Sequence, residues 1–525
     1  MSRRFALVSL VIPFFAMAAD WSVTDVVSLT NAFSKAAAND SIRIAAGTYE
    51  LDGSAMGTTT YLTTTEAKPL KILGMGAKPE DTVLKGGGYD GGHRILSIYA
   101  MEGVIVSNLT FTGGAITNNN TGGAILCTLT ANGKRARIAK CRFVENVCYG
   151  TLYTDVFCSG GGAIGISVPS KGGPVKTAMD ISDCWFESNR NMLMNKQADG
   201  GALVATYSTV SDCVFTNNYA SNNGGAVIDG EHFRNRFLYN RANGEFSPTG
   251  MGGGAARRVK DRLVFSDCYF EGNTTLTANN HGGVIYNADA CSNCVFFANG
   301  ARSNGMIENC PIIYKCHFEN NDAANYLSGA ADYEYCSVWS NKVNGQIFNG
   351  AKTLRNCLIV SNNCGNVKGM VQNAKLYNCT FVGNYLYSGN TAESVINYQC
   401  VAVNCLFYDN NVKGGHYDIA LYDTITVPVL SNCQWGAQFY VNNRSKFESR
   451  LSEAYLIPTS PFEPTASNPY MIGKNSAARD AGCLDDSVRR LVGDRDLAGK
   501  PRVSTSKIDL GCYEFQAPGL VLIFR

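Results

Sequence analysis

The sequence is short of charge. Charged residues make up 17% of the 525 residues, and 45 Lys and Arg against 43 Asp and Glu leave a formal net charge of +2. A near-neutral chain without basic blocks is not typical of proteins whose main partner is nucleic acid. Beyond residue 19 the chain also lacks a run of about 20 apolar residues, the length that a helix needs to cross a bilayer. We therefore expect no nucleic-acid partner and no transmembrane segment in the mature chain.

The N-terminus has the features of a secretory signal peptide. Arg3 and Arg4 form a positive start, residues 5–15 are apolar, and Ala16-Met17-Ala18 is a small-x-small cleavage site. The alternative, a buried N-terminal helix, fits less well because the apolar run ends at once in polar residues. We predict that residues 1–19 are removed and that the protein is exported, being extracellular or associated with a cell surface or outer membrane.

Two short units alternate along most of the chain. The first is Cys-x-Phe-x-x-Asn, with an aliphatic residue in place of Phe in some copies. Its copies begin at Cys141, Cys184, Cys213, Cys268, Cys294, Cys316, Cys336, Cys357, Cys379 and Cys405. The second is Gly-Gly-small-aliphatic, which begins at Gly122, Gly200, Gly224, Gly253 and Gly282. Such self-similarity at short period is typical of solenoid proteins.

The spacing of the first unit predicts the fold. Phe296, Phe318, Val338, Ile359 and Phe381 are 22, 20, 21 and 22 residues apart. This is too short for helix-containing repeats of about 33 residues and suits one all-β coil. The Cys and Phe of a unit are two residues apart and share one face of a strand, while the Asn suits a turn. The leucine-rich repeat signature is absent. We predict an all-β, single-stranded right-handed parallel β-helix over residues 20–442.

The cysteines follow the same pattern. Eleven of the 20 take one inward position on successive coils, where buried Cys behaves as a small hydrophobe. Parallel neighbours in register give poor disulfide geometry, so we expect a stack of thiols. Cys483 and Cys512 lie outside the repeat and are predicted to form a disulfide. Cys291-x-x-Cys294 has no second Cys-x-x-Cys to accompany it, so no metal site is expected.

The two ends of the predicted solenoid differ from the repeat. Residues 27–37 can form an amphipathic helix with Leu29 and Phe33 on one face, which we predict to cap the first coil and protect its open edge. Residues 443–525 have few repeat features and four prolines before residue 470. We predict that they form a small C-terminal module for capping or surface association.

Three resemblances to known families follow from these segments. The alternation of the two units over residues 108–410 resembles the repeats of polymorphic outer-membrane proteins, which are surface adhesins with β-helical passengers. Residues 40–49 look like the first coil of pectate-lyase-like secreted proteins, and residues 509–514 are similar to a module that closes many bacterial surface β-helix proteins. The adhesin family carries a long membrane-embedded delivery domain that has no counterpart after residue 442, so we expect separate attachment or release.

Candidate ligand-binding residues are of two kinds. The only basic cluster inside the repeat region could hold an acidic glycan, or could be a solvated strand edge; it comprises Arg257, Arg258, Lys260 and Arg262. Three aromatic residues in the long insertions between units could stack on sugar rings, or could cover the coil; they are Tyr149, Tyr153 and Phe157. Insertions on a regular scaffold are where binding specificity usually lies.

No catalytic constellation stands out in the sequence. β-Helical lyases use clustered acidic calcium ligands with an Arg base, and hydrolases use paired carboxylates. Asp183, Asp212 and Asp267 each precede a stack cysteine, but the series is better interpreted as a turn ladder. The leading hypothesis is therefore adhesin-like binding of a polysaccharide or cell-surface glycan, without catalysis or cofactor. The alternatives are a polysaccharide lyase, with calcium, or a glycoside hydrolase acting on acidic polysaccharide, and a structural envelope protein.

Overall fold

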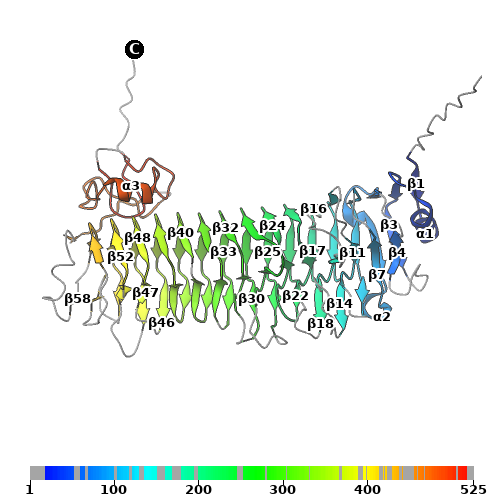
Figure 1. Ribbon diagram of the computed structural model, residues 1–525, viewed down its shortest axis with the longest axis horizontal. Coiled ribbons are helices and arrows are strands. Elements are labelled where there is room, and N and C mark those ends of the chain that lie inside the picture. Colours follow the sequence, from blue (N-terminus) through cyan, green and yellow to red (C-terminus); the bar gives the residue numbers. More distant parts are fainter. Residues whose placement is uncertain are drawn as a thin grey trace, which may run out of the picture.

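The computed structural model describes most of the chain beyond the N-terminal segment. The described residues are 18–51, 60–64, 69–99, 103–117, 121–128, 135–150, 160–167, 179–193, 199–244, 252–277, 281–302, 304–329, 331–365, 369–387, 394–397, 399–412, 418, 420–421, 429–436, 440–441, 455–457, 459–465, 468–503 and 507–516. They form one long solenoid, with the helix α3 (Asp486–Val492) and its surrounding segments packed on one side near the C-terminal end (Figure 1).

A regular coil adds one strand to each of four parallel sheets, here termed A, B, D and C in chain order. Sheet A contains β1 (Asp20–Val23), β2 (Ser41–Ile44), β5 (Lys71–Gly74), β8 (Ile105–Ser107), β12 (Ala136–Ala139), β16 (Met179–Ser182), β20 (Thr209–Ser211), β24 (Gly230–Phe233), β28 (Leu263–Ser266), β32 (Ala290–Ser292), β36 (Ile312–Tyr314), β40 (Asp332–Glu334), β44 (Thr353–Arg355), β48 (Lys375–Tyr377), β52 (Val401–Val403) and β56 (Val429–Ser431). Sheet B contains β3 (Gly47–Leu51), β6 (Thr82–Gly86), β9 (Thr110–Thr112), β13 (Arg142–Val144), β17 (Trp185–Glu187), β21 (Val214–Thr216), β25 (Arg236–Leu238), β29 (Tyr269–Glu271), β33 (Val295–Phe297), β37 (His317–Glu319), β41 (Ser337–Trp339), β45 (Leu358–Val360), β49 (Thr380–Val382), β53 (Leu406–Tyr408), β57 (Gln434–Trp435) and β59 (Tyr455–Leu456).

The other two sheets are shorter. Sheet D contains β10 (Ala115–Ile116), β14 (Val147–Gly150), β18 (Arg190–Leu193), β22 (Tyr219–Ala220), β26 (Arg241–Ala242), β30 (Thr274–Thr275), β34 (Gly300–Ala301), β38 (Asp322–Ala323), β42 (Lys342–Val343), β46 (Asn363–Gly365), β50 (Tyr385–Tyr387) and β54 (Asn411–Val412). Sheet C contains β4 (Thr60–Thr64), β7 (Arg94–Ile98), β11 (Ile125–Thr128), β15 (Ile164–Ser167), β19 (Leu203–Val204), β23 (Val227–Ile228), β27 (Ala256–Arg257), β31 (Ile285–Tyr286), β35 (Gly305–Glu308), β39 (Tyr326–Gly329), β43 (Gln346–Asn349), β47 (Gly369–Gln372) and β51 (Ser394–Asn397). Near the C-terminal end, β55 (Ala420–Leu421) pairs with β58 (Tyr440–Val441). The predicted right-handed parallel β-helix is confirmed.

Each residue of the Cys-x-Phe-x-x-Asn unit has a fixed place in the coil. The Phe lies at the centre of a sheet B strand and points inward, and successive rings from Phe111 to Phe318 stack at centroid distances between 4.6 and 5.2 Å. The Cys lies at the corner between sheets A and B, and the Asn at the corner between sheets B and D. The described cysteines are free thiols, buried except for Cys483, as expected for a thiol stack.

A helix forms near the start of the solenoid, close to where the sequence predicts one. It is α1 (Val26–Lys35), with Asp25 as a side-chain N-cap, and its residues Leu29, Ala32 and Phe33 are buried. These residues join the main hydrophobic core, and α1 packs against the strands β1 to β4. Protection of the open sheet edge by this helix stays a prediction. Two short helical segments, η1 (Pro79–Asp81) and α2 (Gly88–Gly91), lie in the next coils.

The C-terminal segments leave the solenoid later than the sequence suggests. The strand β59, beyond the expected boundary at residue 442, still pairs with β57 in sheet B. The following chain folds back on the solenoid, where Leu358, Val360 and Val382 form a hydrophobic cluster with Cys512 and Tyr513. None of the described helices is long and apolar enough to cross a membrane.

Candidate functional site

Three chemically active side chains lie side by side on the outer face of sheet C. The strands β27, β31 and β35 pair in register, so that Arg257 lies opposite Tyr286 and Tyr286 opposite Glu308. Side chains alternate along a strand, and because the residue before each of the three is fully buried in the core, these three point outward. Strands in a sheet are about 4.8 Å apart. The three groups therefore form one row with one residue from each of three consecutive coils.

A second line of residues borders this row at the turn that enters sheet C. In the coils that carry a Gly-Gly pair it is the residue immediately before that pair, as in Asp199, Asn223 and His281. The glycine after His281, Gly282, has a φ of +60°, a left-handed conformation that favours glycine. The turn is tight, and the side chain before it is thereby placed next to the outward row.

His281 and Glu308 are hydrogen-bonded to each other within this site. The imidazole Nδ1 lies 2.9 and 3.0 Å from the two carboxylate oxygens of Glu308, which also accepts a hydrogen bond of 3.2 Å from the Gly282 amide. The His281 ring lies 6.0 Å from the Tyr286 ring. The side chain of His281 is 35% exposed and that of Glu308 15% exposed. The side-chain nitrogen of Asn304 also lies 2.8 Å from Nδ1. In the tautomer that carries its proton on Nδ1, which the Glu308 carboxylate favours, Nε2 is a proton acceptor.

Arg257 is held by an acid two coils earlier. Its Nη1 lies 2.9 Å from Asp199 Oδ2, and both side chains are 11% exposed. Asn223 supports the acid by donating a 2.6 Å hydrogen bond to Asp199 Oδ1. The position before the Gly-Gly pair in the coil of Arg257 is Gly252, so no side chain lies there. Burial raises the pKa of Asp199, although the charge of Arg257 and the bond from Asn223 oppose the shift.

Tyr326 lies beside the row, on the strand β39 of the coil that follows that of Glu308. Its strand pairs with β35 so that Tyr326 lies opposite Gly305, and a Cβ added at Gly305 would lie 2.0 Å from the Tyr326 ring. The ring can lie there only because residue 305 is a glycine. Burial raises the pKa of the Tyr326 phenol, and the neighbouring charge of Glu308 and a hydrogen bond to it add to the shift. Tyr326 is therefore a neutral hydroxyl beside the His281–Glu308 pair.

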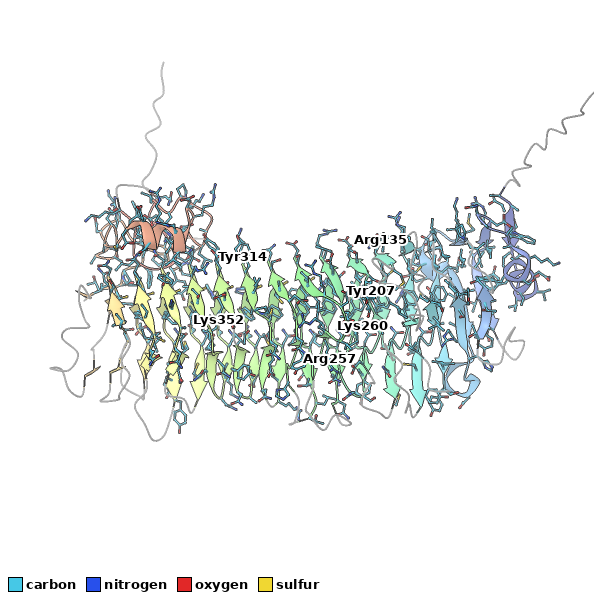
Figure 2. All side chains as sticks on the ribbon, in the orientation of Figure 1. Arg135, Tyr207, Arg257, Lys260, Tyr314 and Lys352 are labelled. Atoms are coloured by element: carbon cyan, nitrogen blue, oxygen red, sulfur yellow. The ribbon has the colours of Figure 1, made fainter. Side chains whose placement is uncertain are left out.

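The predicted basic cluster does not form one surface. Arg257 enters the sheet C row, while Arg258 pairs with Asp289. In the loop that follows, the Lys260 amide donates a hydrogen bond to Asp229, and Arg262 pairs with Glu231 on sheet A at 2.9 Å. Each of the three arginines is thus bound to its own carboxylate. Figure 2 shows Arg257 and Lys260 between Arg135 and Lys352 along the solenoid.

The other predicted site residues lie apart from the sheet C row. The Tyr149 ring stacks on Tyr89 at 4.0 Å, and its hydroxyl donates a 2.8 Å hydrogen bond to the Tyr89 carbonyl, so part of the ring is covered. Tyr153 and Phe157 lie outside the described residues. Whether these residues bind a ligand stays a prediction.

The predicted disulfide between Cys483 and Cys512 is not formed, and both residues are free thiols. The amide of Cys483 bonds to Asn404, whereas that of Cys512 bonds to the Thr380 hydroxyl. The two thiols are held against different coils of the solenoid. Among the residues in the ranges given above, no group of three or more His, Cys, Asp or Glu side chains could hold a metal ion.

Sequence reasoning missed His281, Tyr286 and Glu308. A usable signal exists, because the residue before each Gly-Gly pair and the outward residue of the next strand recur in the coils that carry this unit. At Asp199 and His281 these positions carry acid–base groups. Which of them meet across coils depends on register, which unequal loop lengths hide in the sequence.

The comparisons with known proteins found likeness only among solved structures. No family model and no curated protein matches the chain, so the resemblance to polymorphic outer-membrane repeats stays a prediction. The chain is similar to a mannuronic acid-specific polysaccharide family 6 lyase from human gut microbiota, at 11% identity and a TM-score of 0.30, covering 84% of this chain and 92% of the lyase. It is also similar to the A-module of a mannuronan C-5 epimerase from Azotobacter vinelandii, at 11% identity and a TM-score of 0.27, covering 82% and 96%. A PL6 family polysaccharide lyase from Pseudopedobacter saltans matches at 13% identity and a TM-score of 0.27, covering 87% and 96%. These TM-scores are below 0.5, and we base the functional proposal on side-chain geometry instead.

Proposed function

We propose that the protein binds an acidic polysaccharide across sheet C and cleaves it by β-elimination. The observation that carries the proposal is the His281–Glu308 pair beside Tyr286 and Arg257 on consecutive coils. A hydroxyl and a guanidinium in the outward row, with a proton acceptor beside them, are the groups that elimination from a uronate requires. This favours the enzymatic alternative over the adhesin-like hypothesis drawn from the sequence.

Each group has a separate role in the proposed step. His281 Nε2 takes the proton from the sugar carbon next to the carboxylate. The electron pair of that C–H bond forms a C=C double bond, and the bond from the neighbouring ring carbon to the glycosidic oxygen breaks. The Tyr286 hydroxyl donates a proton to the leaving oxygen. Glu308 stabilises the positive charge that His281 acquires.

Arg257 is the group proposed to hold the substrate carboxylate. Asp199 fixes its guanidinium one coil from Tyr286, and Arg is suited to planar recognition of carboxylates. Negative charge on the sugar must be neutralised for the proton next to the carboxylate to become acidic. The sheet C residues fit hydrolysis by paired carboxylates less well, because Asp199 and Glu308 are each bound to a basic side chain.

The first prediction concerns the acid–base residues. Polyuronates of different composition are incubated with the purified chain, and unsaturated chain ends are followed by their ultraviolet absorbance. We expect product from the native chain, and a loss of kcat of about 10²–10⁴-fold for His281→Ala and for Tyr286→Phe, the usual range for general acid–base groups.

The matched control is His317→Ala. His317 also pairs with a carboxylate, Glu319, at 3.0 Å, and is similarly exposed, but it lies on sheet B. We expect this variant to keep full activity. Retention of a polyuronate without product from the native chain, or equal losses in the His281 and His317 variants, would contradict the elimination proposal.

We also propose that the protein acts outside the cell that makes it, attached to a surface or released. The support is the charged start, apolar stretch and small-residue site within residues 1–19. N-terminal sequencing of protein from the culture fluid and from washed cells is the test. A mature chain that starts at Ala19 or Asp20 supports export, and an intact Met1 in a cytoplasmic fraction contradicts it.

A further inference from the structure

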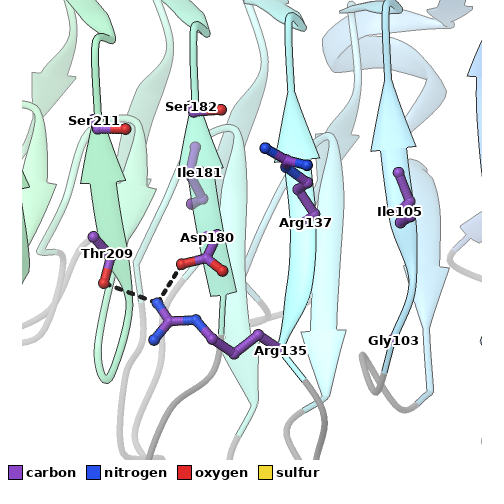
Figure 3. Close-up of a pocket in the computed structure, with 9 residues that line it drawn as sticks. All are labelled: Gly103, Ile105, Arg135, Arg137, Asp180, Ile181, Ser182, Thr209 and Ser211. Carbon is purple, nitrogen blue, oxygen red and sulfur yellow. Dashed lines mark hydrogen bonds and ion pairs between the residues drawn. The ribbon is translucent and has the colours of Figure 1, made fainter.

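A hollow of about 440 Å³ lies on the outer face of sheet A, away from the sheet C row. It crosses the strands β12, β16 and β20, and its lining combines two arginines with an acid and hydroxyl groups (Figure 3). The residues that matter here are Arg135, Arg137, Asp180, Ser182 and Thr209. A few polar groups that converge in a concave surface are typical of ligand sites.

The two arginines of this hollow differ in their partners. Arg135 pairs with Asp180 and donates hydrogen bonds to the Thr209 hydroxyl at 2.8 Å and to the Met179 carbonyl at 3.2 Å. Arg137 lies next to Asp180 in the strand register and is exposed. Figure 3 shows its guanidinium turned away from Asp180. The Arg137 side chain has no hydrogen bond or ion pair with any residue in the described parts of the chain, so the hollow contains one uncompensated positive charge.

A second hollow, of about 390 Å³, lies on the same coils at the corner between sheets A and B. Asp183, which lines it, follows Ser182 of the first hollow directly in the chain. Its aromatic wall is Trp185, which is 39% exposed and points outward from β17. Beside it, Arg142 is fixed by Glu80 at 2.9 Å and Glu187 at 3.1 Å. An exposed Trp offers a flat apolar face that most monomeric proteins keep covered.

We propose that these two hollows form an accessory binding site for an acidic polysaccharide. The carboxylate or sulfate of one sugar binds to Arg137, and a neighbouring sugar stacks on Trp185. The choice of an acidic polymer rests on the proposed function, whereas the site itself rests on the two hollows. No imidazole is among the groups argued here, unlike at the sheet C row, so the site is proposed to hold the chain without cleaving it.

The advantage of such a site is local concentration. A single charge-assisted contact and one stacked ring are each modest. A polymer held at sheets A and B keeps its other segments near the sheet C row, so the second contact becomes intramolecular. The effect depends on chain length, because only a long polymer reaches both sites.

The test compares long and short substrates with the full chain. The variants Trp185→Ala and Arg137→Gln change exposed side chains. We expect each to weaken binding of a fluorescent polyuronate at least 10-fold and to raise KM for the polymer, with kcat and KM for short oligosaccharides unchanged. The control is Arg241→Gln, which removes an exposed arginine from sheet D and should leave polymer binding unaltered. His281→Ala should keep the polymer affinity of the native chain.

The outcomes separate this site from the proposed function. Native polymer affinity in both Trp185→Ala and Arg137→Gln overturns the accessory site, whether or not His281 proves essential. Equal weakening by Arg241→Gln also overturns it, because the binding is then nonspecific attraction to positive charge. Polymer binding that depends on Trp185 and Arg137 without any cleavage by the native chain supports the site and refutes the elimination proposal.

Discussion

The asparagines at the corner between sheets B and D show how one residue type serves every coil. Each amide nitrogen donates to a Phe-position carbonyl of the preceding coil and to the amide oxygen of the next asparagine, as Asn321 does to Phe296 and Asn341. An amide has both a donor and an acceptor, so the ladder can continue without limit. It ends at Asp418, a carboxylate that accepts from Asn410 and from the Gly436 amide. An acceptor-only side chain suits the last position, because no further amide oxygen follows.

The second prediction concerns how much this asparagine ladder contributes to the stability of the fold. Asn321→Ala removes the acceptor of the buried Asn299 backbone amide, one of the two acceptors of the Asn299 side-chain nitrogen, and a donor to the Phe296 carbonyl. An unsatisfied buried polar group costs about 1–3 kcal/mol, so we expect a loss of about 3 kcal/mol or more in the free energy of unfolding, measured by urea titration. Asn349→Ala, at an exposed position of sheet C, should stay within about 0.5 kcal/mol of the native chain. Equal losses in the two variants would show that the ladder adds no stability.

At the scale of elements, the C-terminal segments are fastened by three turn asparagines of the last coils. Asn356 donates to the Val492 carbonyl, Asn378 to the Asp509 carbonyl, and Asn404 exchanges two hydrogen bonds of 2.8 Å with the backbone of Cys483. In earlier coils the same corner carries residues such as Asp183 and Asp212. In the last coils this corner is therefore an interface, whereas at Asp212 it is a partly exposed surface that pairs with Arg234.

A buried charge cluster holds the same segments together. Arg502 is completely buried, lies 3.7 Å from Glu514, and donates to Asn356. Asp496 and Asp509 lie nearby and accept backbone hydrogen bonds from Glu514 and Asp480. Burial, followed by the charge of Asp509, raises the pKa of Glu514 to about 8. Burial also raises the pKa of Asp496 and Asp509.

The sign of the resulting pH dependence follows from linkage. A carboxyl with a raised pKa binds its proton more tightly when folded, so its contribution is full below its ordinary pKa of 4.5 and is lost as pH rises through about 8. We expect the melting temperature of the C-terminal segments, followed by calorimetry, to fall over this pH range. Glu514→Gln should flatten the fall, and Glu463→Gln, at an exposed position, should not. A melting temperature that rises with pH would contradict the assignment.

These elements also show what the sequence could and could not predict. The strands and the Cys, Phe and Asn stacks were predictable, because identical residues recur at one position and each coil repeats the same local physics. The sheet C row was not, because His281 and Tyr286 belong to one coil and Glu308 to the next, and the two coils meet only through register. The disulfide between Cys483 and Cys512 was wrongly predicted for a related reason. Their position outside the repeat does not show which coil of the solenoid each residue contacts.

At the scale of the whole molecule, the solenoid is a one-dimensional array in which each coil contacts mainly its neighbours. In Figure 1 the C-terminal segments lie against the last coils only, and α1 against the first. Stability is therefore expected to vary along the length, with coils near an end opening more readily than those between. The thiol stack gives a natural reporter of this, because it runs through coils from Cys141 to Cys433.

The last prediction uses that stack. The thiolate is the reactive form, and burial raises the pKa of the stack thiols Cys294 and Cys433, so these two should react with an alkylating reagent only when their coil opens. Among the described cysteines, Cys483 alone is partly exposed and should react at once. In mild denaturant, mass spectrometry of labelled peptides should then show Cys433 modified before Cys294. Labelling of all core thiols with one rate constant would mean that the solenoid opens as a single cooperative unit, and the one-dimensional account of its stability would be wrong.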